Sequence, residues 1–243
     1  NTKEALELVG NLSAPSKMPC QSWSTSALRC ITGAKLAKVK NSICSTCYAM
    51  RGNYRFPAVK SSHEKRFQSL SNPLWVEAMT KAIEGTESSG FFRWHDSGDI
   101  QSLFHLEQIA QVAKNLPLIQ FWIPTREYSF VSQYVSKHGA FPANLTVRLS
   151  AYMIEGKAPI ELAKRLNLTT SGVSKIGFIV PHPRKATNAF RAVPVGIKKL
   201  KCELQKALEV NNKISLIMIF WLAIVVSFAA FALNKLEEKK NKA

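Results

Sequence analysis

The sequence predicts an α/β fold: a partial (β/α) barrel of parallel strands, with an N-terminal cysteine-rich loop region and a C-terminal hydrophobic helix. Short apolar segments alternate with helical segments across residues 91–180, which is the pattern of βα units. Polar residues cluster directly after each apolar segment, where parallel α/β folds place their active sites. No glycine-rich phosphate-binding turn follows a strand, so a barrel fits better than a doubly wound sheet.

The expected elements follow in chain order. A short helix opens the chain, and a loop over residues 13–19 leads into the cysteine segment. Helices are predicted over residues 57–70, 72–83, 102–116 and 128–137. Strands are predicted over residues 91–95, 118–123, 145–149 and 176–180. Because these strands alternate with helices, we expect them to pair in parallel.

One stretch supports a second interpretation. Residues 161–176 have the apolar spacing of a helix-turn-helix, with Thr169 and Thr170 placed to cap the second helix. That helix, however, would run directly into the apolar segment at 176–180, which is predicted to be a strand. We therefore keep the strand in the predicted fold and treat DNA reading as the alternative use of this stretch.

The cysteines are concentrated near the start of the chain. Four of the five, Cys20, Cys30, Cys44 and Cys47, precede residue 48, and the last two have the spacing Cys-x-x-Cys. This spacing lets two thiolates converge on one metal or cluster. Lysines and arginines surround the segment, and we expect them to lower the pKa of the thiols. The chain starts without a secretory signal, which favours a reducing compartment and metal binding, with two structural disulfides as the alternative.

Polar side chains at the expected strand ends form a second group. As catalytic candidates, which would face one cleft, we take His95, Asp96, Asp99, Arg126 and Glu127. As cofactor-binding candidates we take Tyr48, Ser97, Gly98, Thr125 and Ser150. A histidine with two carboxylates can perform acid–base chemistry, and an arginine oriented by a neighbouring glutamate can hold a carboxylate or phosphate. In the structural alternative, the aspartates cap a helix and Arg126–Glu127 is an ordinary ion pair. The remaining histidines are interpreted as surface or packing residues: His63, His105 and His138.

The C-terminal part differs in character from the rest. Residues 214–233 contain no charged side chain, and twenty apolar residues suffice to cross a bilayer core of about 30 Å. Eight basic residues precede this segment from position 184, against four after it, so we expect a cytoplasmic domain with a tail anchor in a membrane. The predicted organisation is residues 1–183 for the cysteine-motif domain, 184–213 for a basic linker or juxtamembrane helix, 214–233 for the transmembrane helix and 234–243 for a basic tail.

The formal net charge is +17 and is spread over both parts of the chain. Such an excess favours a polyanionic partner or an anionic membrane surface, with an anionic small molecule or a nucleic acid as the candidate ligands. The lone Cys202 in the basic linker is expected to be a free thiol.

Several motifs together resemble the phage "gene product 88" family across residues 10–180. These are Ser16–Pro19, Cys30–Val39, Cys44–Ala49, Arg93–Asp99 (Arg-Trp-His-Asp-Ser-Gly-Asp) and Phe121–Glu127. The resemblance implies a phage-encoded protein that acts in a bacterial host. Members commonly have glycine at the position of Cys20, which leaves that residue an open fourth ligand. They also tend to carry a second cysteine-rich segment near the C-terminus, where this chain has the hydrophobic segment instead; a native tail anchor and a truncation or shifted frame are the two explanations.

The Cys-x-x-Cys-Tyr segment followed by βα units also resembles radical S-adenosylmethionine enzymes, whose partial barrels hold a [4Fe–4S] cluster on three cysteines. That resemblance implies a cluster on Cys30, Cys44 and Cys47, with S-adenosylmethionine as a further cofactor. The first hypothesis is therefore an iron–sulfur, radical-SAM-like enzyme acting on an anionic substrate, a nucleotide or nucleic acid. The second is a zinc-stabilised nucleic-acid-binding protein without catalysis, which uses all four cysteines. The third is a membrane-tethered protein with a vestigial cleft.

Overall fold

The structure, a computed structural model, describes residues 1–16, 18–174 and 177–179. Its strands form one sheet in the order β1-β2-β3-β4-β5-β6, so that neighbours in the sheet are also consecutive in the chain. The strands are β1 (Gln21–Trp23), β2 (Phe91–Trp94), β3 (Gln120–Thr125), β4 (Leu145–Ile154), β5 (Thr169–Ser174) and β6 (Gly177–Ile179). The first five pair in parallel and β6 pairs antiparallel to β5. The predicted α/β class with a parallel sheet is confirmed.

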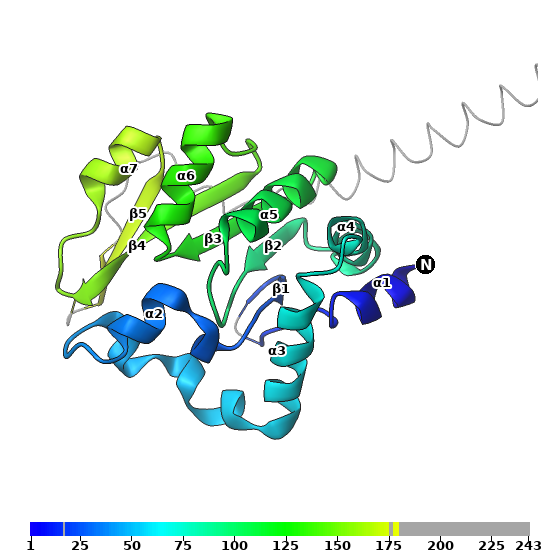
Figure 1. The fold of residues 1–243 in the computed structure, drawn as a ribbon, viewed down its shortest axis with the longest axis horizontal. Helices are drawn as coiled ribbons and strands as arrows, with labels where there is room; N and C mark the ends of the chain where they lie inside the picture. The colour runs from blue at the N-terminus through cyan, green and yellow to red at the C-terminus, as the bar shows by residue number, and fades with distance from the viewer. Residues whose placement is uncertain (17, 175–176, 180–243) are drawn as a thin grey trace, which may run out of the picture. The chain divides into compact units, whose positions relative to one another are not determined.

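The helices connect these strands (Figure 1). They are α1 (Thr2–Leu8), α2 (Ile31–Leu36), α3 (Pro57–Ser69), α4 (Trp75–Thr86), α5 (Leu103–Asn115), α6 (Tyr128–His138) and α7 (Ile160–Leu166). Local chemistry sets their ends: the Ser102 hydroxyl accepts from the His105 N–H at the start of α5, and Gly139, with a φ of 81°, ends α6. Between β1 and α3 the chain makes α2 and the short 3-10 turns η1 (Ala27–Arg29), η2 (Ile43–Thr46), η3 (Tyr48–Met50) and η4 (Gly52–Arg55).

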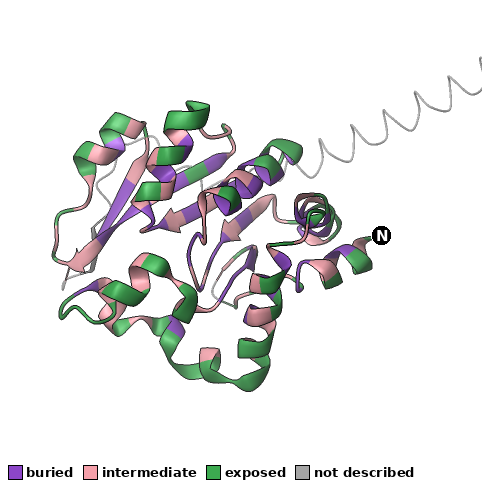
Figure 2. Cartoon of the chain, in the orientation of Figure 1, coloured by how far each residue is buried: buried purple, intermediate pink, exposed green. Residues whose placement is uncertain are grey.

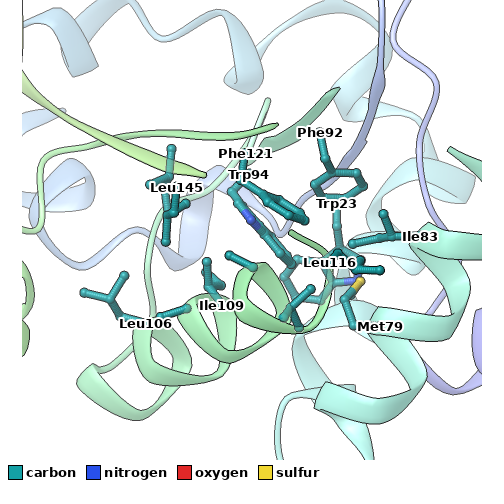
Figure 3. Packing of buried hydrophobic residues seen from close by; sticks show 14 of the residues in the cluster. Trp23, Met79, Ile83, Phe92, Trp94, Leu106, Ile109, Leu116, Phe121 and Leu145 are labelled. Atoms are coloured by element: carbon teal, nitrogen blue, oxygen red, sulfur yellow. The ribbon is translucent and has the colours of Figure 1, made fainter. Parts of the chain in front are cut away.

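The hydrophobic core lies on one face of the sheet. Burial alternates along the central strands: Phe92 and Trp94 of β2 are buried, whereas Arg93 between them is only half-buried. The buried face packs against α1 and α4–α7, through residues such as Met79 and Ile109 (Figure 3). Figure 2 shows the contrast between these buried strands and the mostly exposed segment from η1 to α3. A parallel sheet covered on both faces would have continuous apolar strands instead.

Several expected boundaries and one motif differ from the structure. Residues 169–174, assigned to the second helix of a helix-turn-helix, form strand β5, so that interpretation is wrong. The predicted fourth strand, β6, is antiparallel rather than parallel. Helix α4 begins at Trp75, because Asn72 caps the turn before it by accepting from the Leu74 N–H. Strand β3 lies about two residues later than expected, and β1 was not predicted.

Within the described residues, no helix combines the length and apolarity needed to cross a membrane. The expected linker (184–213), transmembrane helix (214–233) and basic tail (234–243), together with Cys202, lie outside those residues. They stay predictions from the sequence.

Candidate functional site at the carboxyl edge of the sheet

Helix α2 lies beside the ends to which the parallel strands point (Figure 1). Three of the four N-terminal cysteines are grouped around it, close enough for Cys44 and Cys47 to raise the pKa of Cys30. Cys30 caps the N-terminus of α2, and Cys44 and Cys47 lie on η2 and at its end, where the Cys47 N–H donates to the Cys44 carbonyl (3.3 Å). A Cβ atom added to Gly33 would lie 2.8 Å from the Cys30 Cβ, 3.5 Å from the Cys30 Sγ and 3.6 Å from the Cys44 Sγ. Glycine is therefore required at this position, because any side chain would overlap Cys30, and both thiols lie beside it.

The electrostatic surroundings of these thiols are acidic. Burial raises the pKa of Cys30, and Asp99, Cys44, Cys47 and Glu127 raise it further. Burial also raises the pKa of Cys44, and the positive charge of Arg126 opposes this only in part. The expectation that basic residues lower the pKa of the thiols is therefore wrong for Cys30 and Cys44. The lysines and arginines of the segment point into solvent instead: Lys35, Lys38, Lys40, Arg51, Arg55 and Lys60.

Cys20 lies elsewhere. It directly precedes β1 at the amino edge of the sheet, in a shallow pocket that also includes Met18 and Glu87. Burial and the charge of Glu87 raise its pKa to about 11. The three residues of β1 alone separate Cys20 from the opposite edge by about 10 Å. Cys20 therefore does not join the other three, and all four described cysteines are free thiols in the structure.

Asp99 occupies the centre of the carboxyl edge. Its Oδ1 accepts from the Thr125 hydroxyl (2.6 Å) and the Ile100 N–H (2.8 Å), and its Oδ2 accepts from the Arg126 N–H (3.0 Å). Burial raises the pKa of Asp99 to about 6, although these hydrogen bonds oppose the rise. A carboxyl with this pKa can gain or lose a proton near neutral pH.

Glu127 fixes the cysteine segment to the sheet. The Thr32 N–H donates to its Oε1 (2.8 Å) and the Thr32 hydroxyl to its Oε2 (2.7 Å). The Glu127 N–H in turn donates to the Thr125 Oγ1 (3.0 Å). Thr32 lies in the first turn of α2, so this buried carboxylate positions the helix that Cys30 caps.

The Arg126 side chain has a different partner from the expected one. Its Nε donates to the Ala151 carbonyl (3.0 Å), and within the described residues it has no carboxylate within 4 Å. The expected ion pair with Glu127 is therefore wrong, because both Glu127 oxygens are engaged by Thr32. Ser150, another expected site residue, lies one strand further on; its hydroxyl accepts from Ser171 (3.4 Å) and its carbonyl accepts from the Tyr128 hydroxyl.

Asp96 lies in a network of hydroxyl groups. Its Oδ1 accepts from Ser22 (3.1 Å) and from Ser24, and its Oδ2 accepts from Tyr54 (2.8 Å). Burial favours a higher pKa for Asp96, but these three hydrogen bonds and the positive charge of Arg93 outweigh it and hold the pKa below its ordinary value. The Tyr48 hydroxyl donates to the Asp96 carbonyl, which places this exposed ring at the same edge.

His95 does not face the cleft. Its φ of 64° turns the ring into the core, where it lies 6.0 Å from the Trp23 ring and 5.3 Å from the His105 ring, centroid to centroid. Burial lowers its pKa to about 4, and neither ring nitrogen has a hydrogen-bond partner in the part of the chain described. The expected role of His95 as a catalytic group in a common cleft is therefore not supported by its position.

The remaining candidates support the backbone of this edge. The Ser97 carbonyl accepts from the Thr25 N–H (3.1 Å), and its hydroxyl is buried. Gly98 has a φ of 84° and packs against Thr25 so closely that a Cβ would overlap the threonine hydroxyl. As expected for packing residues, His63 and His105 are buried; His138 lies at the surface and pairs with Glu107 (2.8 Å).

Sequence reasoning missed the contribution of the first strand. Ser22, Ser24 and Thr25 belong to β1 or follow it directly, and they contact Asp96 and Ser97. The only sequence feature that could have indicated their role is the cluster of polar residues around Trp23 in the segment Gln-Ser-Trp-Ser-Thr. This segment is too short and too polar to predict a buried strand.

Within the described residues, no group of three or more His, Cys, Asp or Glu side chains is placed to hold a single metal ion. Around one tetrahedral zinc ion, thiolate sulfurs stand about 3.8 Å apart. In a [4Fe–4S] cluster each cysteine binds a different iron, so the sulfurs stand further apart. Cys30 and Cys44 lie beside Gly33, and Cys47 is close enough to Cys30 to raise its pKa. Three grouped thiols are the ligand set that such a cluster requires.

Comparison with known proteins identifies one family. The family model described as Gene product 88 matches residues 1–211. No curated protein and no solved structure matches the chain.

Proposed function

The chain belongs to the phage gene product 88 family, and for this member we propose an iron–sulfur enzyme that binds a [4Fe–4S] cluster through Cys30, Cys44 and Cys47 and acts on an anionic substrate. One observation carries the proposal: the three thiols are grouped at the carboxyl edge, with Cys30 and Cys44 both beside Gly33. Three cysteines leave one iron without a protein ligand. Bound there, such a cluster would supply one-electron chemistry and an iron open to a substrate or cofactor.

The neighbouring residues have separate tasks in this proposal. Glu127 holds α2 in place through Thr32, which orients Cys30. Asp99 stands next to the thiols, and a pKa of about 6 suits it to accept or donate a proton during turnover. The Arg126 guanidinium, whose Nη atoms have no carboxylate partner among the described residues, adds positive charge for an anionic group.

The order of the strands supports the same proposal. Five parallel strands in chain order are what a partial (β/α) barrel requires. We include the use of S-adenosylmethionine as the reaction class to test, because radical-SAM-like chemistry needs a cluster on three cysteines at this edge. The zinc alternative required all four cysteines, and the position of Cys20 at the other edge argues against it.

The test is metal analysis of the full chain, purified anaerobically in mild detergent. We expect brown protein with about four irons and four sulfides per chain. Cys44→Ala should lose the iron and the visible absorption, whereas Cys20→Ala, a matched cysteine control, should retain both. Colourless protein with one zinc, or a folded protein without any metal, would overturn the proposal. If iron is found, cleavage of S-adenosylmethionine under reducing conditions is the next measurement.

A further inference from the structure

The segment that contains the three grouped cysteines exposes a concentration of positive charge. Residues 30–63 contain six lysines and arginines and no Asp or Glu. All six are exposed, and none forms an ion pair with another described residue: Lys35, Lys38, Lys40, Arg51, Arg55 and Lys60. The segment therefore attracts anions without neutralising its own charge.

Two aromatic rings are exposed in the same segment. Tyr48 on η3 and Phe56, which directly precedes α3, each expose 58% of their surface. Arg51 and Arg55 lie between them in the chain, at the ends of η3 and η4. Exposed rings that gather in one region mark a surface to which a partner binds.

Packing brings these short turns together. The Tyr48 ring contacts the Tyr54 ring of η4 edge to face, with 5.8 Å between the centroids, and Tyr54 stacks on His63 of α3 at 6.1 Å. Turn η3 therefore lies beside η4, and η4 lies beside α3, in the part of the chain that Figure 2 shows as mostly exposed. The exposed rings and cations of these turns form one region, the η3–η4 surface, which consists of Tyr48, Arg51, Arg55, Phe56 and Lys60.

Tyr48 joins the η3–η4 surface to the thiols. It directly follows Cys47, and its hydroxyl donates to the Asp96 carbonyl, which holds the ring at the carboxyl edge of the sheet. Turn η3 also packs against η1, which ends at Cys30. A molecule that lies on the Tyr48 ring would therefore lie next to the cysteines of the proposed cluster.

We propose that the η3–η4 surface binds single-stranded nucleic acid, with bases stacked on the Tyr48 and Phe56 rings and phosphates held by the surrounding cations. Proteins bind single strands through exposed aromatic rings among basic side chains, because every base has a flat face that can stack. A duplex would not bind in this way, since its bases are already stacked on one another. The inference deepens the proposed function, on which the word substrate rests: the anionic substrate is then a nucleic acid strand. Binding itself depends only on the exposed surface.

A lipid surface is the alternative partner, because aliphatic side chains are exposed in the same segment: Leu28, Ile31 and Val39. A strand fits the η3–η4 surface better. Its exposed rings are aromatic, and arginines lie between them in the chain, which is the pattern of a site that stacks bases and binds phosphates.

The experiment measures binding of fluorescently labelled strands to the full chain, loaded with iron and kept in mild detergent, by fluorescence anisotropy. The probes are a ten-residue oligodeoxyuridylate, the oligouridylate of the same length and an abasic deoxyribose-phosphate strand of the same length. We expect Phe56→Leu, which stays apolar but loses the flat ring, to weaken binding of the two base-bearing strands about fivefold or more. Tyr48→Phe keeps the ring and should bind within about twofold of the parent. Phe104→Leu, at another exposed phenylalanine on α5, is the matched control and should bind as the parent does.

The contribution of the cations is measured through the dependence of affinity on salt. Arg51→Gln and Arg55→Gln should each reduce the slope of log affinity against log salt concentration by about 0.7, the value for one phosphate contact on a single strand. Lys81→Gln, at an exposed position on α4, removes the same charge and should leave the slope unchanged.

Three results would overturn the inference: the same affinity in Phe56→Leu and Phe104→Leu, equal affinity of the parent for abasic and base-bearing strands, or an unchanged salt slope in both arginine variants. Binding of soluble dihexanoyl phosphatidylglycerol without binding of any strand would overturn it in favour of a lipid surface. If the strands bind as expected, the ratio of the affinities for oligouridylate and oligodeoxyuridylate identifies the strand as RNA or DNA. Parallel iron analysis keeps the two proposals apart: protein with iron but without strand binding contradicts only this inference, and the reverse contradicts only the cluster.

Discussion

Glu127 shows at the scale of one residue how distant segments are joined. Its carboxylate accepts two hydrogen bonds from Thr32, 95 positions earlier in the chain. The carboxylate is buried, so it depends on these donors for its solvation. The position of α2, and with it of Cys30, therefore depends on one side chain at the end of β3.

Thr32→Val is predicted to destabilise the protein by about 1–3 kcal/mol, because it removes a donor from a buried carboxylate while keeping the shape of the side chain. The measurement is the free energy of unfolding by urea. Thr146→Val, at an exposed position on β4, is the matched control and should change stability by less than about 0.5 kcal/mol. Equal effects of the two substitutions would contradict the importance of the Thr32–Glu127 contact.

Gly98 and Gly90 allow a second comparison between matched residues. Both have positive φ values, 84° and 80°, but a Cβ on Gly98 would overlap the Thr25 hydroxyl and lie 2.9 Å from its carbonyl, whereas the space at Gly90 is open. Gly90→Ala should cost about 1–2 kcal/mol for the left-handed backbone. Gly98→Ala should cost clearly more in the same urea experiment. A similar cost for both variants would show that the edge around Thr25 adapts easily.

At the scale of elements, the cysteine segment of the described chain is built from short elements only. Residues 27–56 consist of α2 and short 3-10 turns, and most of their side chains are exposed (Figure 2). Short turns of this kind contribute little stability by themselves. A cluster bound to Cys30, Cys44 and Cys47 would tie three points of this segment together.

Removal of iron by a chelator is therefore predicted to make this segment several times more sensitive to trypsin, with cleavage first after Arg51 or Arg55, both of which are exposed. Mass spectrometry of the early fragments identifies the sites. Cys20→Ala, with its cluster intact, should be cut as slowly as the parent protein. Equal cleavage rates with and without iron would mean that the segment owes its order to other contacts.

The elements also show what the sequence could and could not predict. Helix α5 was predicted within one residue, because Ser102 and the amphipathic repeat are local signals. Strand β5 (Thr169–Ser174) was missed because it is polar, and its pairing with β4 is what makes it a strand. The grouping of Cys44 and Cys47 follows from their spacing. The acidic surroundings of the thiols could not be predicted in this way, because Asp99 and Glu127 come from distant segments and only folding brings them close.

At the scale of the whole molecule, the aromatic core contains two buried histidines. The rings of His95 and His105 pack against Trp23 and are nearly inaccessible to solvent. Burial lowers the pKa of His95 to about 4 and that of His105 well below its ordinary value. The folded protein therefore keeps both imidazoles neutral at pH values where the unfolded chain, with histidine pKa values of about 6.5, takes up protons.

The sign of the pH dependence follows from this difference. Above pH 6.5 both histidines are neutral in the folded and the unfolded state. As the pH falls from about 6.5 toward 4, each lowers the free energy of unfolding by up to about 1.4 kcal/mol per pH unit. Asp99, whose pKa burial raises to about 6, offsets part of this loss below pH 6, because the folded state then binds its proton first. Urea unfolding across this range measures the slope. His105→Gln, which removes one of the two buried imidazoles, should make this slope clearly less steep. A parent protein with equal stability at pH 4.5 and 7 would contradict the prediction.

The order of the strands has a consequence for how the protein is made. On the ribosome, β1 and the three cysteines emerge early, but the strand that neighbours β1 in the sheet, β2, follows about seventy residues later (Gln21 with Phe92). Asp99 and Glu127, which line the thiols, are synthesised later still. At about 5–20 residues per second, the nascent chain carries exposed cysteines for several seconds before its sheet can form around them. The proposed cluster would therefore bind either after β3 has been completed or to a cysteine segment that the sheet does not yet enclose.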